Sequence, residues 1–276
     1  GDTDPDPRLL KLVRKITDRI PAKLKGVTTN DPEYWGFACI FMDEMDDDMR
    51  DFSLDLMNQM KLRHHYSIQE LRDMAKAKDP EELERFQKYI DRLAILGMLE
   101  YDYGDRYTKN GPIAGATYTL EDRYYWIPFF VPGSAEYTNM SERLLDKYPE
   151  LAMFFERMTF LPLEKVTPFV PMGGNGIGMH VIPVEKAIEA ENTSIDIEHI
   201  SYWLKRYKGH IAAGMCSCRY GRKLLDEGCG DDYRDWCIGV GDMAEYLVET
   251  NRGRYITHEE CLEILQRAED NGFVHQ

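Results

Sequence analysis

Four of the six cysteines in the chain fall within one short segment, and this clustering constrains the fold more than any other feature. The segment begins Cys216-Ser-Cys218-Arg and continues to Cys229 and Cys237. Thiols this close in sequence are typical of a metal or iron–sulfur centre, around which the chain folds. We therefore expect Cys216, Cys218, Cys229 and Cys237 to be the ligands of such a centre.

The cysteine spacing leaves the identity of the centre open. Structural zinc sites usually pair two C-x-x-C motifs, and many iron–sulfur clusters also use C-x-x-C, so the C-x-C of Cys216 and Cys218 departs from both. Two disulfides are disfavoured, because neighbouring cysteines strain a mutual bridge and six cysteines in 276 residues fit a reducing compartment. Iron–sulfur is the favoured interpretation and zinc the alternative.

Basic residues lie in the same segment and would offset the charge of a four-thiolate centre. We expect Arg219, Arg222 and Arg234 to surround the ligands without binding the metal. We also expect Cys237 to lie just before a helix that begins near 239–242, where the positive helix end would stabilise a thiolate.

Charge and hydropathy exclude two classes of partner. The chain has a net charge of −15 at pH 7, which repels nucleic acid and anionic membranes. It has no apolar run near the length of about 18 residues that a spanning helix needs. We expect a soluble, cytoplasmic protein, and its start at Gly1 instead of Met indicates a trimmed chain.

The N-terminal part predicts helices followed by a small β-hairpin. Ser67 and Glu70 form a capping box for a short helix, and Asp79-Pro80 opens a longer one that ends at Gly97. Two β-like segments follow, 98–103 and 117–120, which completes a winged-helix pattern. The longer helix carries more acidic than basic residues, so we do not expect it to bind DNA.

Two further motifs resemble ligand sites but lack the residues that such sites need. The acidic run 43–48 has no glycine and no alternating ligand spacing, so we interpret it as a solvated helix face and not as a calcium loop. The glycine-rich run 173–178 follows no buried strand and precedes no Walker lysine, which favours a structural turn over a phosphate site.

These patterns predict a mainly α (α+β) chain in three parts. Residues 1–123 form the winged-helix-like part, and 124–192 form an aromatic, proline- and glycine-rich connection that contains one helix, 141–158. Residues 193–276 form a helical domain that holds the four cysteines.

No hydrolytic motif or catalytic nucleophile stands out, so we assign no catalytic residue. Cys39 and Cys261 lie in apolar patterns and are interpreted as small buried side chains. His210 precedes the cysteine segment, and a hydrogen-bonded or surface role is favoured over ligation.

Long collinear runs in the second half carry a family resemblance. This half resembles the amino-terminal region of bacterial FAD-dependent pyridine nucleotide-disulfide oxidoreductases that carry 4Fe-4S motifs, and the match covers most of 124–276. The matching runs are Val131–Glu136, Phe154–Lys165, Met179–Ala187, Cys216–Arg219, Gly228–Gly230, Asp235–Leu247, Gly253–Thr257 and Gly272–Gln276.

The resemblance implies an electron-transfer module and not a complete enzyme. It implies a [4Fe-4S] cluster on Cys216, Cys218, Cys229 and Cys237 that exchanges electrons with a flavoprotein domain or partner. The flavin and nicotinamide domains of the family follow this region, and no strand followed by G-x-G-x-x-G occurs here. FAD and NAD(P) are therefore expected only on a further domain or on a partner.

Overall fold

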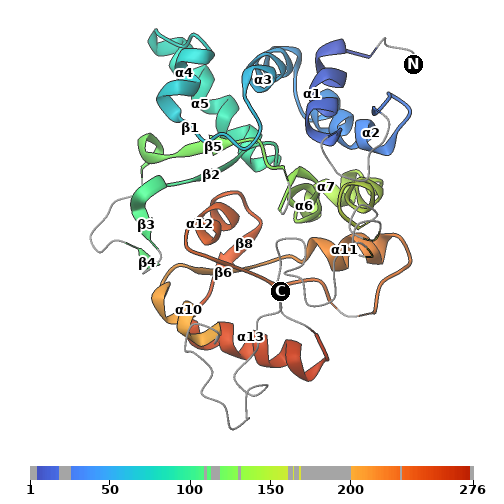
Figure 1. Ribbon diagram of the computed structural model, residues 1–276, viewed down its shortest axis with the longest axis vertical. Helices are drawn as coiled ribbons and strands as arrows, with labels where there is room; N and C mark the ends of the chain where they lie inside the picture. Colours follow the sequence, from blue (N-terminus) through green and yellow to red (C-terminus); the bar gives the residue numbers. More distant parts are fainter. Residues whose placement is uncertain are drawn as a thin grey trace. The chain divides into compact units, whose positions relative to one another are not determined.

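Helices make up most of the described chain, with small antiparallel sheets between them (Figure 1). The computed structural model describes residues 5–18, 26–108, 111–112, 119–129, 132–160, 164, 168, 200–230 and 232–273. The glycine-rich run 173–178 lies outside these residues. None of the helices in the described ranges is long and apolar enough to cross a membrane.

The chain forms two compact units, and each is assembled from three segments. Unit 1 comprises residues 1–102, 119–166 and 217–232, and unit 2 comprises 103–118, 167–216 and 233–276. These units do not follow the predicted division at residues 123 and 192, because unit 1 draws on all three predicted parts.

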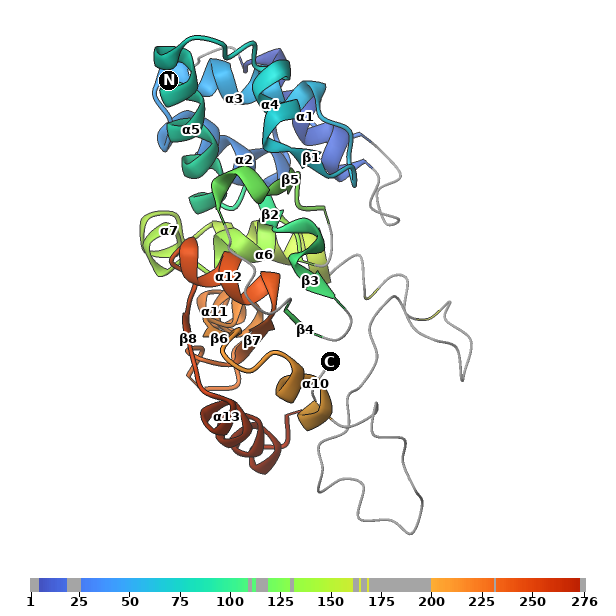
Figure 2. The same ribbon diagram turned by 90° about the vertical axis from the view of Figure 1, so that its left-hand side faces the viewer.

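Unit 1 begins with three helices and a π-helical turn. They are α1 (Pro7–Thr17), α2 (Pro32–Ala38), η1 (Cys39–Asp43) and α3 (Asp47–Gln59). α1 buries one apolar face, since Leu9, Leu12, Val13 and Ile16 are buried. Figure 2 shows these helices grouped with α4 and α5.

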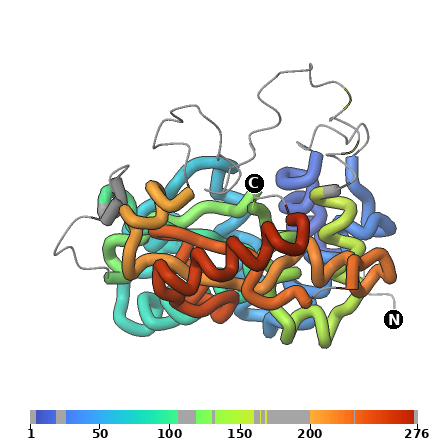
Figure 3. Tube along the Cα trace, turned by 90° about the horizontal axis from the view of Figure 1, so that it is seen from below, coloured from blue at the N-terminus to red at the C-terminus, as the bar shows by residue number. Residues whose placement is uncertain are grey.

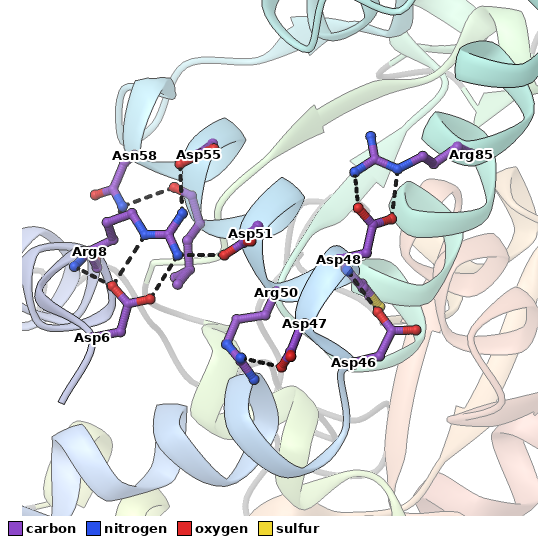
Figure 4. Close-up of polar contacts among 12 residues, drawn as sticks. Asp6, Arg8, Asp46, Asp47, Asp48, Arg50, Asp51, Asp55, Asn58 and Arg85 are labelled. Carbon is purple, nitrogen blue, oxygen red and sulfur yellow. Dashed lines mark hydrogen bonds and ion pairs between the residues drawn. The ribbon is translucent and has the colours of Figure 1, made fainter. Parts of the chain in front are cut away.

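The acidic run spans the end of η1 and the start of α3, and its aspartates are exposed as predicted, whereas the Glu44 side chain is buried. The Asp46 carboxylate caps the helix by accepting from the Met49 N–H at 2.8 Å. Figure 4 shows that guanidinium groups from other helices bind this face: Arg85 donates twice to Asp48, at 2.7 and 2.8 Å, and Arg8 reaches Asp51 and Asp55. The run is thus a helix cap and an ion-pair surface.

The predicted capping box is present, since Ser67 caps α4 (Ile68–Met74) with Glu70. Asp79 opens α5 (Pro80–Ile95) as predicted, and with Glu82 it forms a second box. Each box satisfies N–H groups that the first helical turn leaves without a partner inside the helix.

A three-stranded antiparallel sheet follows, in the order β1-β5-β2. Its strands are β1 (Tyr66–Ser67), β2 (Glu100–Asp102) and β5 (Tyr124–Trp126). β2 confirms the first predicted β segment. The second prediction, 117–120, is wrong where the structure describes it, because Leu120 opens the 3₁₀ turn η3 (Leu120–Asp122) and the strand begins at Tyr124.

The predicted helix 141–158 is wrong, because the structure breaks it at Pro149. The segment contains α7 (Glu142–Lys147), α8 (Leu151–Phe155) and the start of the π-helical η4 (Glu156–Phe160), and α6 (Ser134–Asn139) precedes it. Proline has no N–H and disfavours helical geometry in the residue before it; accordingly Tyr148 leaves the helical region at φ −132° and ψ 72°.

The last part of unit 1 is α11 (Ser217–Leu224), which packs against α6 and α8. Gly221 allows this close packing: a Cβ atom at Gly221 would lie 3.4 Å from both Asn139 Oδ1 and Phe155 Cδ1. The helix and the loop that follows it carry Cys218 and Cys229.

Unit 2 contains a three-stranded antiparallel sheet between helices, a sheet that the helical prediction for 193–276 missed. The sheet has the order β7-β6-β8, with β6 (Ile211–Gly214), β7 (Cys237–Val240) and β8 (Gly253–Tyr255). The helices are α10 (Ile200–Arg206), α12 (Asp242–Glu249) and α13 (His258–Asp270). Short pieces η2 (Gly104–Arg106), β3 (Tyr107–Thr108) and β4 (Gly111–Pro112) complete the described elements of the unit.

Because successive residues of a strand point to opposite faces, the two faces of this sheet pack against different helices. Ile211 and Ala213 pack in one apolar cluster with α10 and α13, and α13 lies in the foreground of the view in Figure 3. Gly239 faces the other way, because a Cβ atom there would lie 2.9 Å from Leu247 on α12. All four residues of β6 are therefore buried.

Candidate functional site

The four predicted ligands divide equally between the two units. Cys216 and Cys237 belong to unit 2, while Cys218 and Cys229 belong to unit 1. All six cysteines lie in described residues, and none forms a disulfide. Among the described residues, no three His, Cys, Asp or Glu side chains are placed to hold a metal ion.

The pair in unit 2 lies at one end of the sheet. Cys237 is the first residue of β7 and pairs with Gly214, the last residue of β6, and Cys216 follows two residues later. The Cys216 N–H donates to the Tyr233 carbonyl at 2.7 Å, which fixes the backbone beyond the strand. Cys216 is buried and Cys237 is partly exposed.

The helix predicted to begin near 239–242, after Cys237, is confirmed, because α12 starts at Asp242. Cys237 opens strand β7, and α12 begins only at Asp242, after the left-handed Gly241 at φ 63°. The first residue of α12 therefore lies five positions after Cys237 in the sequence.

The pair in unit 1 is exposed and lies on α11 and its C-terminal loop. Cys218 is the second residue of α11, and Cys229 lies five residues beyond the end of this helix. The Arg219 guanidinium connects helix and loop, since its Nη1 donates to the Cys229 Sγ at 2.9 Å. This contact joins a predicted ligand sulfur directly to one of the predicted basic neighbours.

The other two predicted basic neighbours have different contacts. Arg222 forms ion pairs with Glu227 on the loop and, at 3.3 Å, with Glu156. Arg234 lies 4.7 Å from the centre of the Tyr233 ring, beside the carbonyl that binds Cys216. Arg222 therefore forms ion pairs with carboxylates. Arg234 packs on Tyr233, whose carbonyl binds the Cys216 N–H.

The cysteines outside the cluster have the environment of ordinary thiols. Cys261 is fully buried in the apolar cluster of unit 2, and burial raises its pKa to about 12. Burial, reinforced by the neighbouring Glu150 carboxylate, also raises the pKa of Cys39 to about 12. Both sulfurs stay protonated at neutral pH, which confirms Cys261 as a small buried side chain; Cys39 is only partly buried.

His210 has the hydrogen-bonded role that the sequence favoured. Its Nδ1 lies 2.6 Å from Glu245 Oε1 on α12, and the Tyr255 hydroxyl contacts the other oxygen of the same carboxylate. His210 thus connects the start of β6 to α12 within unit 2.

Sequence reasoning missed a set of buried carboxylates in unit 1. Glu100 accepts from the Tyr137 hydroxyl at 2.6 Å and from Trp126 Nε1 at 3.1 Å, and burial raises its pKa to about 7. Burial also raises the pKa of Glu136, which accepts from the Gly133 N–H at 2.7 Å. The V-P-G-S-A-E run contained a signal, because Gly133 and Glu136 have capping-box spacing.

Glu44 is a buried carboxylate with three cationic partners. It accepts from Arg143, Lys147 and Tyr148 at 2.7–2.9 Å and from Arg92 at 3.0 Å. Burial would raise its pKa, but these hydrogen bonds outweigh burial and lower the pKa to about 2. We therefore assign Glu44 a structural role, because both of its carboxylate oxygens accept hydrogen bonds from cationic side chains.

Comparisons of the chain with family models, with curated proteins and with solved structures found no match in any of the three.

Proposed function

We propose that the chain is an iron–sulfur electron-transfer module whose cluster is bound by Cys216, Cys218, Cys229 and Cys237. The observation that carries the proposal is the density of thiols in one segment, none of them used in a disulfide. Thiolates are the ligands that iron–sulfur clusters and structural zinc both take. The proposed partner is a flavoprotein domain or subunit.

The contact between Arg219 and Cys229 adds support. A thiolate-bound cluster carries negative charge, and hydrogen bonds to its sulfurs raise its reduction potential. A guanidinium 2.9 Å from a ligand sulfur supplies both a positive charge and such a hydrogen bond. We therefore assign Arg219 the role of tuning the centre.

The arrangement of the described residues limits how far this chemistry can be derived. Since no three ligand-type side chains among them are in position to hold a metal ion, we derive no step through the cluster. The proposal requires the four sulfurs to come together when iron and sulfide bind, and metal binding coupled to folding is common in small metal-binding domains.

In the same proposal, the N-terminal winged-helix-like part binds a protein partner. Helices α4 and α5 and the small β1-β5-β2 sheet support this assignment. Two arginines of α5 are engaged by acids of unit 1, Arg85 by Asp48 and Arg92 by Glu44, and the first turn of α5 carries Glu81 and Glu82. These charges favour a protein partner over DNA.

Metal analysis of anaerobically purified protein tests the proposal. We expect iron and sulfide at about four per chain with a visible absorption band, as for a [4Fe-4S] cluster. The Cys218→Ala variant should lose all three signals, and the matched control Cys39→Ala should keep them. Zinc at about one per chain without sulfide would instead identify a structural zinc module.

A further inference from the structure

The β1-β5-β2 sheet of unit 1 has one buried face and one face that is partly open (Figure 1). Successive residues of a strand point to opposite faces, and residues paired in register point to the same face. Tyr66, Tyr125 and Tyr101 are paired in register across the sheet, and all three are buried. The other residues of the strands form the opposite face, here called the open face: Ser67, Tyr124, Trp126, Glu100 and Asp102.

The open face combines aromatic rings with carboxyl groups. Tyr124 is 40% exposed, and Asp102, its partner in the register, has a side chain that is 24% exposed. Trp126 is paired with Glu100 in the same way, and its Nε1–H donates to the Glu100 carboxylate at 3.1 Å. The three strands contain neither lysine nor arginine. An aromatic ring beside a carboxylate is an environment that binds cationic groups.

A basic side chain of the protein itself shows how a planar group lies on this face. His65 directly precedes β1, so it stands across from Trp126. The imidazole stacks on the indole, with ring centres 4.0 Å apart and ring planes 9° apart. Its Nδ1 lies 3.8 Å from an Asp102 carboxylate oxygen. Because the His65 side chain is half exposed, this stack lies at the surface, where a partner can reach it.

Glu100 makes the open face suited to a cation. Its partners among the described residues are neutral: the Tyr137 hydroxyl of α6 donates to it at 2.6 Å, and the Trp126 N–H donates at 3.1 Å. Burial, reinforced by the nearby Asp102 and Glu136 carboxylates, raises the pKa of Glu100 to about 7. A positive charge on this face would favour the ionised carboxylate, whereas an anion would oppose it.

These features favour an arginine over other cations. A guanidinium is planar, stacks on aromatic rings and donates through a fork that fits a carboxylate, whereas an ammonium is a compact point charge. The net charge of −15 attracts basic partners, and arginine, tyrosine and tryptophan are enriched at protein interfaces. We propose that the open face binds an arginine side chain of a partner protein, with Tyr124 stacking on the guanidinium and Asp102 accepting from it.

This inference gives a surface to the protein partner that the N-terminal part is proposed to bind, and it rests on that part of the proposed function. It does not depend on the iron–sulfur cluster, because the three strands contain no cysteine. Metal analysis and arginine binding can therefore fail independently of each other.

Titration of the full chain with N-acetyl-arginine amide tests the inference, with heteronuclear NMR of the tryptophan indole N–H groups as the readout. We expect the Trp126 signal, assigned with Trp126→Phe, to shift saturably, because its N–H binds Glu100 on the open face. The signals of Trp35, Trp203 and Trp236 are internal controls and should stay unchanged.

Two variants locate the guanidinium. Asp102→Asn and Tyr124→Ala should each weaken binding about fivefold, as expected for an exposed ion pair or cation–π contact. The matched controls are Glu81→Gln, which removes an exposed carboxylate at the start of α5, and Trp35→Ala, which removes a similarly exposed ring on α2. Both controls change unit 1 away from the sheet and should leave the affinity unchanged.

Three outcomes with the unaltered chain would overturn the inference. They are the absence of a saturable Trp126 shift, an equal shift of all four indole signals, and an equal response to N-acetyl-citrulline amide, which has the same shape without the charge. Equal weakening by Glu81→Gln would also overturn it. An unchanged Trp35 signal in Asp102→Asn and Tyr124→Ala shows that unit 1 remains folded in these variants.

Discussion

The interiors of the two units are built differently. Unit 2 encloses an apolar cluster in which β6 is buried on both faces against α10, α13 and α12, and its buried charged residues, Glu245 and Arg252, lie outside that cluster. Unit 1 buries more carboxyl groups: Glu33 and Glu136 are buried, the Glu44 side chain is 3% exposed, and Glu100 is partly buried.

Because of this difference, we expect the stability of the two units to depend on different changes. The stability of an apolar interior depends on how closely its side chains pack, so a change in side-chain volume should destabilise unit 2 most. A buried carboxylate must be neutral or paired with cations, so the stability of unit 1 should depend on pH. The cysteine pairs follow the same division: Cys216 lies beside the packed sheet, and Cys229 is exposed and accepts a hydrogen bond from the Arg219 guanidinium.

The largest expected effect is overpacking of the unit 2 sheet by Gly253→Ala. The new methyl group would lie 2.7 Å from the Ala213 carbonyl oxygen and 3.3 Å from the Gly214 Cα, and both contacts are backbone. We expect the free energy of unfolding to fall by about 3 kcal/mol. Hydrogen exchange should rise in peptides of β6 and β8 and not in those of α3 or α5. Equal loss of protection in both units would contradict the separation.

The next effect is the pH dependence that Glu100 gives to unit 1. Its folded pKa, about 7, exceeds its ordinary value of 4.5, so its contribution is present below pH 4.5 and is lost as pH rises through 7. Glu100→Gln mimics the neutral acid, and at pH 8 it should stabilise the protein by about 2 kcal/mol. Denaturant unfolding at pH 5 and pH 8 measures this.

At pH 5 the same substitution should have little effect, because the wild-type acid is then mostly protonated when folded. A gain of the same size at both pH values would mean that the amide improves packing and that proton binding is not the cause.

Glu44 should show the opposite pH dependence. Its folded pKa lies below the ordinary value, so its contribution is present above pH 4.5 and is lost as pH falls toward 2. Glu44→Gln should lower the stability of the protein by about 1.5 kcal/mol at pH 7. This figure is smaller than the pKa shift alone implies, because Arg143 and Lys147 are half exposed and solvent screens their charges. The matched control is Asp48→Asn, whose ion pair with Arg85 is on the surface and should matter less.

Local signals in the sequence predicted helix starts well and missed the long-range features. The capping residues Ser67, Asp79 and Thr257 each lie directly before a helix, because a cap depends on only four neighbouring residues. α13 ends at Asp270, shortly before Gly272, whose left-handed φ of 75° glycine adopts readily. The helix broken at Pro149 carried a local signal that the apolar periodicity obscured.

The sheet of unit 2 and the buried acids lacked such local signals. β6 is buried on both faces, so its sequence shows no polar alternation that would mark a strand. Glu44 is bound by Arg92, Arg143 and Lys147, which lie 48 to 103 residues away. The clustering of the cysteines was visible in the sequence, whereas their division between two units depends on tertiary contacts.

The smallest expected effect is Gly221→Ala, the unit 1 counterpart of the Gly253 change. Gly221 lies inside α11, where alanine favours the helix by up to about 1 kcal/mol over glycine. The new Cβ atom would sit 3.4 Å from Asn139 Oδ1 and Phe155 Cδ1, at ordinary contact distance. We expect a net stabilisation of about 0.5 kcal/mol, read from the denaturation midpoint. A loss as large as that of Gly253→Ala would show that α6 and α11 pack as rigidly as the unit 2 sheet, so that buried polar groups do not loosen the fit of unit 1.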